Sequence, residues 1–535
     1  MCTRHNGKST GKQYLAAALF FPIFPQEGTV TMKVKRISAL LLALLLFSVS
    51  CSTTTSEDGG SDIAENPSDV GTAPELTAET EAPQEDRTQY DPHLDAVDYG
   101  GAAFTVLYNY GNDLEPNKDF TCEELNGEIV NDAKYNRNIA LCDKYNITTE
   151  YINGGGDSSV VGTVTSSVAA GDNAYSYVDN NAQYCVQMAS KGTLLEISQL
   201  PIVDYSAPYW NSLMLEGSSI SHKNYFVFSD INIHAYGATP CMIFNKVVHK
   251  NYGLEDLYEI VLNGNWTFDK ACEMISVITH DLDGDGNITK DDALGLIANN
   301  FCIDCFISGT GYQLITKDEA DMPVLNVSTE QMMNIMDGIK RVCSEQTGTF
   351  LVDRTSTATE AREYWTERAI TEDRALFWVG NIKCVERMRA SESDFGVVPM
   401  PKYDSAQENY AVHVQANIGS MSCFPITVSE NAEMVGRITE EMAYISFRDV
   451  MPAYMDVCID GKTIRDEESL ACLEIIRSSY YCDLGFMFQQ MGLQLLGTMR
   501  DYVTQNKTDY MSSLKSNQKV WNKSLEKIGK AFAEG

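Results

Sequence analysis

Short apolar runs alternate with longer segments of mixed polarity along most of the chain. The pattern predicts buried β-strands at 103–108, 147–152, 175–178, 224–228, 241–244 and 394–399. It predicts helices at 128–145, 158–170, 181–190, 255–262 and 268–279, and a closing helix with Leu514, Trp521, Leu525, Ile528 and Phe532 on one face. Strands that alternate with helices are typical of a parallel sheet covered by helices, so we expect an α/β fold.

The hydrophobic run nearest the N-terminus has a different character. A basic segment, Met32–Arg36, precedes the apolar run Leu40–Phe47, and Ser48–Cys51 follows. This order is typical of a secretory signal, and the run is too short to span a membrane, which takes about 20 residues. The segment resembles a bacterial lipoprotein signal, which implies that Cys51 is lipidated and becomes the first mature residue. Plain secretion with an incidental cysteine is the alternative.

The residues around this signal are expected to lie outside the folded protein. Residues 1–31 are interpreted as an upstream mis-start, because Gln26–Gly28 can be encoded by a ribosome-binding site just before Met32. Residues 32–50 would be the signal peptide. Residues 51–96 hold twelve acidic side chains and one basic one, Arg87. Such a stretch cannot bury enough apolar surface to offset its ordering entropy, so a disordered tether is predicted.

Charge and cysteine content narrow the possible partners. After Cys51 becomes the first residue, the chain has 34 Lys and Arg against 73 Asp and Glu, a net charge of −39. This balance disfavours binding to nucleic acid and adhesion to anionic lipid, and it is compatible with a neutral or cationic ligand and with divalent cations. Thirteen cysteines follow Cys51 without a repeating framework, so most are interpreted as small buried hydrophobes.

The segment 281–292 matches the twelve-residue calcium loop of the EF-hand. Gly286 permits the sharp turn at the sixth position, and Gly295 indicates that no full helix leaves the loop. A single loop favours a fixed, structural Ca²⁺ over a paired sensor. The expected ligands are the oxygens of Asp281, Asp283, Asp285, Asn287 through its carbonyl, Thr289 and Asp292.

The remaining candidate chemistry is aromatic. Trp378 precedes Gly380 and Asn381 and is expected in a loop, where its flat face could stack on a sugar ring; core packing is the alternative. Trp266 and Trp521 are interpreted as core residues. We find no nucleophile elbow, zinc-protease motif or phosphate-binding loop, so an enzyme is not expected, although a glycosidase carboxylate pair stays open.

The order of four motifs resembles the extracellular solute-binding lipoproteins of bacterial ABC transporters, the carbohydrate-type (family 1-like) group of Gram-positive bacteria. Residues 125–138 look like the first helix of that family, and 239–246 like its first crossover between lobes. Residues 264–270, before the acidic loop, are similar to the opening of the second lobe. Residues 394–402 with 407–410 look like the return crossover.

This resemblance implies a two-lobe, type II periplasmic-binding-protein-like fold with a ligand cleft at the hinge. It would place the first lobe at 97–242 plus 410–455 and the second at 243–409 plus 456–535. Ligands of open α/β sheets bind beyond the carboxyl ends of strands. That rule gives the expected ligand-binding residues Asn109, Tyr110, Asp230, Asn232, Tyr236, Trp378 and Tyr410.

The combined prediction is a lipid-anchored, calcium-stabilised monomer that captures a sugar or oligosaccharide for ABC transporter permease subunits at the outer face of the cell membrane. A secreted carbohydrate-active enzyme is one alternative, and it would need two carboxylates facing each other across a cleft. A calcium-dependent cell-surface scaffold module is the other, although such a module is expected to duplicate the calcium loop.

Overall fold

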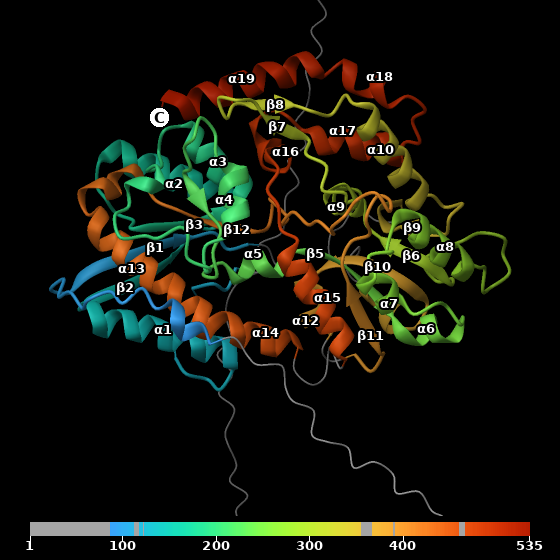
Figure 1. Cartoon of the computed structure of the whole chain (residues 1–535), viewed down its shortest axis with the longest axis horizontal. Helices are drawn as coiled ribbons and strands as arrows, with labels where there is room; N and C mark the ends of the chain where they lie inside the picture. Colours follow the sequence, from blue (N-terminus) through green and yellow to red (C-terminus); the bar gives the residue numbers. More distant parts are fainter. Residues whose placement is uncertain are drawn as a thin grey trace, which may run out of the picture. The chain divides into compact units, whose positions relative to one another are not determined.

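Two five-stranded sheets organise the protein (Figure 1). The computed structural model describes residues 86–534 except 112–116, 121, 123, 355–365, 389–390 and 460–465. The expected mis-start, the signal peptide, Cys51 and the tether up to residue 85 lie outside the described residues. In the described part of the chain, no helix is both long and apolar enough to cross a membrane.

The first sheet has the order β2-β1-β3-β12-β4. Strand β1 pairs in parallel with β2 and β3, whereas β12 is antiparallel to β3 and β4. Its strands are β1 (Ala102–Tyr108), β2 (Ile147–Asn153), β3 (Tyr177–Asn181), β4 (Phe226–Val227) and β12 (Ser420–Cys423). We call this sheet and its helices the first lobe: α1 (Ile129–Tyr145), α2 (Asp157–Ala170), α3 (Ala182–Ser190), η2 (Ile197–Gln199), α4 (Ser212–Ser218), α5 (Ile233–Gly237), η5 (Ile426–Glu430), α13 (Ala432–Ile445), η6 (Ser446–Val450) and α14 (Met451–Ile459).

The second sheet has the order β11-β5-β10-β6-β9. Strand β10 is parallel to β6 and antiparallel to β5, which also pairs with β11. Its strands are β5 (Pro240–Asn245), β6 (Leu294–Ala298), β9 (Thr349–Leu351), β10 (Ala375–Asn381) and β11 (Phe395–Val398). We call this sheet and its helices the second lobe: α6 (Lys246–Asn251), α7 (Leu257–Leu262), α8 (Phe268–Ile278), α9 (Cys302–Gly309), α10 (Glu330–Val342), η3 (Val352–Arg354), α12 (Ile382–Arg387) and α15 (Glu467–Ser478).

Asparagine marks the point where several strands turn into helices. Asn181, Asn245 and Asn381 each end a strand, and each side-chain oxygen accepts a hydrogen bond from the backbone N–H three residues later. An N-cap of this kind satisfies one of the N–H groups that the first helical turn leaves unpaired. The capped starts of α3, α6 and α12 therefore follow directly from the sequence at the strand ends.

The C-terminal segment contacts both lobes. Its elements are α16 (Leu484–Met487), η7 (Phe488–Met491), α17 (Leu495–Thr504), α18 (Tyr510–Lys515) and α19 (Gln518–Glu534). Helices α16 and α19 pack against α3 of the first lobe, whereas α17 packs against α9 and α10 of the second. Helix α19 also lies along the hairpin of β7 (Ile315–Lys317) and β8 (Pro323–Leu325) (Figure 1). The second-lobe range predicted for 456–535 thus includes a segment that bridges the lobes.

Two boundaries differ from the prediction. The tether was expected to stay disordered to residue 96, but a short helix, η1 (Arg87–Tyr90), already packs on the first lobe. The guanidinium of Arg87 donates to the Phe447 carbonyl and lies over the Phe447 ring, and Tyr90 meets that ring edge-on. These contacts order the end of the tether. The lobe boundary expected at residue 242 falls inside β5, whose six residues are all buried in the second sheet.

Candidate functional site

A cavity of about 330 Å³ lies where the two lobes and the C-terminal segment meet. Gln183 at the start of α3 comes from the first lobe, and Phe301 and Asp304 at the start of α9 come from the second. The wall is completed by residues 413–417, which return the chain to the first sheet, and by residues of α16, η7 and α17. Its amide-bearing side chains are Gln183, Gln415, Asn417, Gln489, Gln490 and Gln494.

The charged groups that line this cavity form a pair. Arg500 Nε donates to Asp304 Oδ1 at 2.8 Å, and a second bond joins Nη2 to Oδ2. Asp304 is only 2% exposed, and burial raises the pKa of its carboxyl although Arg500 opposes this shift. A buried carboxylate needs such a bidentate partner, because an isolated charge would lose its solvation. The pair therefore leaves this wall polar without a net charge.

Two side chains of the returning segment have buried polar atoms without a hydrogen-bond partner among the described residues, His413 Nε2 and Gln415 Oε1. Burial lowers the pKa of His413 to about 4, so its ring is neutral at pH 7. Its Nδ1 lies against the Val414 carbonyl, and the backbone of Asp483 also faces the ring. The ring stacks on Phe486 with centroids 4.7 Å apart. Gln415 Oε1 would gain from a ligand that donates a hydrogen bond.

None of the seven residues predicted to bind ligand lines this cavity. Asn109 and Asn232 are at most 1% exposed, and their amides donate to Asp157 and Asp179 inside the first lobe. Asn117 joins them, since its amide donates to both Asn109 and Asp179. These asparagines hold together the ends of β1, β3 and the segment before α5. They lie near the predicted strand ends, but their hydrogen bonds are used within the lobe.

Of the other predicted residues, Asp230 and Tyr236 lie near each other and near Arg477, whereas Tyr110 and Tyr410 lie elsewhere. Tyr110 is 43% exposed after β1, and its binding role stays a prediction. The ring of Tyr236 is buried against that of Tyr480. Asp230 is a buried carboxyl, and its burial raises its pKa to about 6. Tyr410 lines a separate, open pocket of about 680 Å³ on the second lobe and donates to the Val261 carbonyl.

The prediction that Trp378 lies in a loop is wrong. Trp378 lies in β10, paired with Ile243 of β5 and Ile297 of β6, and only 1% of it is exposed. Gly380 and Asn381, which indicated a loop, are the last two residues of the strand, and Asn381 caps α12. The indole has no exposed face on which a sugar could stack. Trp266 and Trp521 are buried as expected, at 0% and 3% exposure.

The cavity residues that the prediction missed come mainly from the C-terminal segment. Gln489, Gln490 and Gln494 lie within six residues of each other between Phe488 and Leu495. Three amides inside an apolar stretch are a sequence signal that could have been noticed. Nothing in the sequence, however, shows that this stretch packs between α3 and α9.

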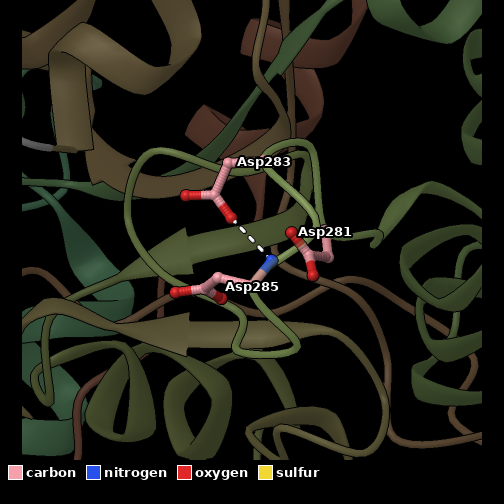
Figure 2. Close-up of side chains that lie close together, drawn as sticks. All are labelled: Asp281, Asp283 and Asp285. Carbon is pink, nitrogen blue, oxygen red and sulfur yellow. Dashed lines mark hydrogen bonds between the residues drawn. The ribbon is translucent and has the colours of Figure 1, made fainter.

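The predicted calcium loop connects α8 to β6, so a strand and not a helix leaves it, as expected. Figure 2 shows the carboxylates of Asp281, Asp283 and Asp285 converging, and one oxygen from each lies within 4.8 Å of the others. Both Asp281 oxygens accept from loop backbone, Gly286 N and Gly284 N, which lowers the pKa of this carboxyl. Gly286 has φ +87°, a conformation that favours glycine. The site fits a hard, oxygen-liganded cation such as Ca²⁺.

The twelfth loop position has a different role from the first three acidic positions. Asp292 is 2% exposed, and its carboxylate accepts from Leu282 N, Thr289 N and the Thr289 hydroxyl. These bonds close the loop from inside. The predicted ligand roles of Asp292, Thr289 and the Asn287 carbonyl stay predictions. The loop precedes β6 whereas Phe301 and Asp304 follow it, so the two sites lie at opposite ends of this strand.

The chain is similar to known proteins at the level of structure. No protein-family model matches the chain, and no curated protein does. Similar solved structures include the ABC substrate-binding protein Lmo0181 of Listeria monocytogenes in complex with cycloalternan, a cyclo/maltodextrin-binding protein complexed with maltotetraose, and UgpB of Mycobacterium tuberculosis in complex with glycerophosphocholine. Their TM-scores are 0.50, 0.53 and 0.52, at 11%, 12% and 13% identity.

The matches extend over nearly the whole of these proteins. Each of the three covers 80% of this chain, and 99%, 98% and 98% of the respective solved chains is matched. At these identities the likeness concerns the fold. The α/β expectation and the two-lobe arrangement are confirmed, and the chain has the fold of the ABC-transporter solute-binding proteins.

Proposed function

We propose that the protein captures a neutral sugar or oligosaccharide for an ABC importer. The observation that carries this proposal is the cavity at the junction of the two lobes, which is lined by amides and by a charge-neutralised pair, Asp304–Arg500. The similar solved structures are binding proteins, and two of those named hold cycloalternan or maltotetraose. The fold and the chemistry of the cavity therefore point to the same ligand class.

The cavity wall suits a polyhydroxylated ligand. A glutamine or asparagine amide has two donor hydrogens and an acceptor oxygen, and a hydroxyl can pair with either. Gln183 and Gln489 already use part of this capacity within the protein, Gln183 with Phe486 and Gln490, and Gln489 with Gly485 and Leu496. Gln415 Oε1, a buried atom on a cavity-lining residue, would accept a hydrogen bond from a ligand hydroxyl. Phe301 and Phe486 supply apolar surface beside these groups, as is usual in sites that combine a few oriented polar groups with aromatic walls. An anion or cation would find its countercharge already engaged in the Asp304–Arg500 pair.

Capture would work through closure of the lobes. Gln183 and Asn417 belong to segments that enter the first sheet or leave it, and Asp304 begins a helix of the second lobe. A ligand that contacts both groups binds the closed arrangement more tightly than the open one. It shifts the equilibrium by that difference in affinity and by no more.

The remaining predictions concern where the protein works. We propose that lipid on Cys51 holds it at the outer face of the membrane, next to the permease subunits that receive the ligand. We propose that Ca²⁺ bound by the 281–292 loop stabilises the junction of α8 and β6. This role is structural, because the loop lies at the end of β6 away from the cavity.

The two alternatives are less well supported. A retaining or inverting glycosidase needs two opposed carboxylates, whereas Asp304 is the one carboxylate among the cavity-lining residues, and Arg500 holds it. A calcium-dependent scaffold would expose its loop as a docking module, but here the loop is integrated between α8 and β6. Binding without turnover is therefore the proposed function.

The test is a ligand screen on the chain that begins at residue 86. Thermal-shift and calorimetric measurements with maltotetraose, cycloalternan, D-mannitol and glycerophosphocholine compare neutral sugars and polyols with a zwitterion. We expect a neutral sugar to raise the melting temperature. Changing Gln490 or Gln494 to Ala should then weaken its binding by about fivefold each, on the order of 1 kcal/mol for a lost hydrogen bond.

Gln505→Ala is the matched control. This glutamine is exposed just beyond α17, outside the cavity, so its variant should bind like the wild type. A preference for glycerophosphocholine over every sugar would contradict the proposed ligand class. Steady release of a cleaved product from a bound oligosaccharide would contradict the binding role and support the enzyme.

A further inference from the structure

Two pairs of cysteine side chains are in contact inside the protein, one pair in each lobe. Cys302 Sγ lies 3.8 Å from Cys343 Sγ, and Cys185 Sγ lies 3.9 Å from Cys423 Sγ. All four residues are thiols in this structure, and each is at most 3% exposed. We propose that Cys302–Cys343 and Cys185–Cys423 are two sites of reversible disulfide formation. This proposal does not depend on the ligand.

The positions of the cysteines allow both disulfide bonds to form. A disulfide holds its sulfurs about 2.0 Å apart, so each pair has to close by about 1.8 Å. Cys302 opens α9 and Cys343 directly follows α10, and these two helices pack together. Cys185 lies in α3 and Cys423 ends β12, which also pack together. Rotation of two short side chains with a small shift of adjacent elements achieves this closure.

A low-molecular-weight disulfide, such as oxidised glutathione, is the oxidant that this step requires. One cysteine thiolate attacks it, forms a mixed disulfide and releases one small thiol. The second cysteine, as thiolate, attacks the protein sulfur of that mixed disulfide and releases the other small thiol. The pair loses two protons and two electrons, and the oxidant is reduced to two thiols.

Burial decides when this exchange can take place. It raises the pKa of Cys185, and contact with Cys343 together with burial raises the pKa of Cys302. Because the thiolate is the reacting form, exchange in the folded protein is slow and belongs to folding or to transient opening. The same burial shields a formed disulfide from reductants.

Each cross-link would join elements of one lobe beside the cavity and would leave the two lobes unconnected by any new bond. Cys302 lies between the cavity-lining residues Phe301 and Asp304, and Cys185 lies two residues after the cavity-lining Gln183. The Cys302–Cys343 bond would join residues that are 41 positions apart in the sequence, and the Cys185–Cys423 bond would join residues that are 238 positions apart. Closing a loop reduces the entropy of the unfolded chain, and the longer loop gains more.

The test compares the full chain oxidised in the native state with the chain refolded from denaturant in a glutathione redox buffer. Each sample is unfolded in denaturant without reductant, free thiols are alkylated with N-ethylmaleimide, and the unreduced digest is analysed by mass spectrometry. We expect two cross-linked peptides, four unlabelled cysteines, and a higher melting temperature than in dithiothreitol. Oxidation during refolding should be at least as complete as oxidation of the native chain.

Cys302→Ser should remove one cross-link and keep the other, and Cys423→Ser should do the converse. Cys305→Ser is the matched control: Cys305 is on the same helix as Cys302, is 1% exposed, and should leave both cross-links intact. Full alkylation of Cys185, Cys302, Cys343 and Cys423 in both samples would overturn the proposal. Cross-links from these residues to other cysteines would overturn it as well.

Discussion

At the scale of single residues, Glu440 illustrates how the first lobe holds buried polar groups. It is 1% exposed on α13, and its carboxylate accepts from the Tyr209 hydroxyl, from Trp210 Nε1 at 3.1 Å and from Asp204 N at 3.2 Å. Burial raises its pKa from 4.5 to about 7, although these donors oppose the shift. Glu440 thus links α13 to the segment before α4, and its effect on the free energy of unfolding depends on pH.

The raised pKa of Glu440 predicts a pH dependence of stability. Between pH 4.5 and 7 the folded protein keeps the Glu440 proton that the unfolded chain has lost, so the free energy of unfolding should fall as pH rises through this window. The full effect is on the order of 3 kcal/mol. Glu440→Gln should flatten this dependence when denaturant midpoints are compared at pH 5 and pH 8. Glu526→Gln, an exposed change on α19, should leave it unaltered. Equal slopes in both variants would contradict the assignment.

Trp378 is predicted to matter for folding and not for ligand contact. Its burial in β10 between β5 and β6 means that Trp378→Ala opens a cavity in the second sheet, which typically costs about 3–5 kcal/mol. We expect a lower melting temperature and unchanged sugar affinity in calorimetry at a temperature where the variant is folded. Trp378→Phe should lose less stability. Loss of affinity without loss of stability would show that the ring reaches the ligand.

At the scale of elements, the 281–292 loop predicts a calcium effect on the junction of α8 and β6. A cation that binds only the folded state stabilises by about 2.7 kcal/mol at a hundredfold excess over its dissociation constant. Asp283→Ala and Asp285→Ala should each abolish the rise in melting temperature caused by added Ca²⁺. Asp291→Ala is the control, because that exposed side chain pairs with Lys290 and lies outside the carboxylate cluster. An unchanged melting temperature in chelator would contradict the site.

Most elements could be predicted because their apolar spacing is regular. Helix α1 begins one residue after its predicted start, and β2 and α2 each differ from the prediction by one residue at one end. The closing helix was predicted too long, since Leu514 belongs to α18 and α19 begins only at Gln518. Strand β12 was missed, because Ser420–Cys423 alternates small polar residues with two apolar ones over only four positions. Its neighbours in the sheet supply the pairing that the local sequence does not indicate.

The cavity was less predictable than the fold. The strand-end rule selected Asn109 and Asn232 as ligand-binding residues, but in the structure these amides bond to carboxylates of the same lobe. The cavity instead combines Gln183, Asp304, Gln415 and Gln490, which come from four separate parts of the chain. Only the tertiary packing of the C-terminal segment brings them together, and a periodic pattern carries no information about that packing.

At the scale of the whole molecule, the C-terminal segment is expected to follow the motion of the lobes. Its α16 contacts α3 of the first lobe, whereas its α17 contacts α9 of the second. Small-angle scattering should show a smaller radius of gyration when a sugar identified by the thermal screen is added. The Gln490→Ala, Gln494→Ala double variant should need more of that sugar for the same change. No compaction at saturating sugar would contradict closure.

The position of β12 in the first sheet also determines when that sheet can be completed during synthesis of the chain. Strand β12 inserts between β3 and β4, and its residue Ser420 pairs with Asn181, far earlier in the chain. A ribosome therefore synthesises the whole second sheet before it releases the strand that completes the first. Until then β3 and β4 have open edges, and the long separation makes their closure slow. The first lobe therefore stays incomplete until residues 420–423 have been synthesised, and only then can β3 and β4 pair with β12.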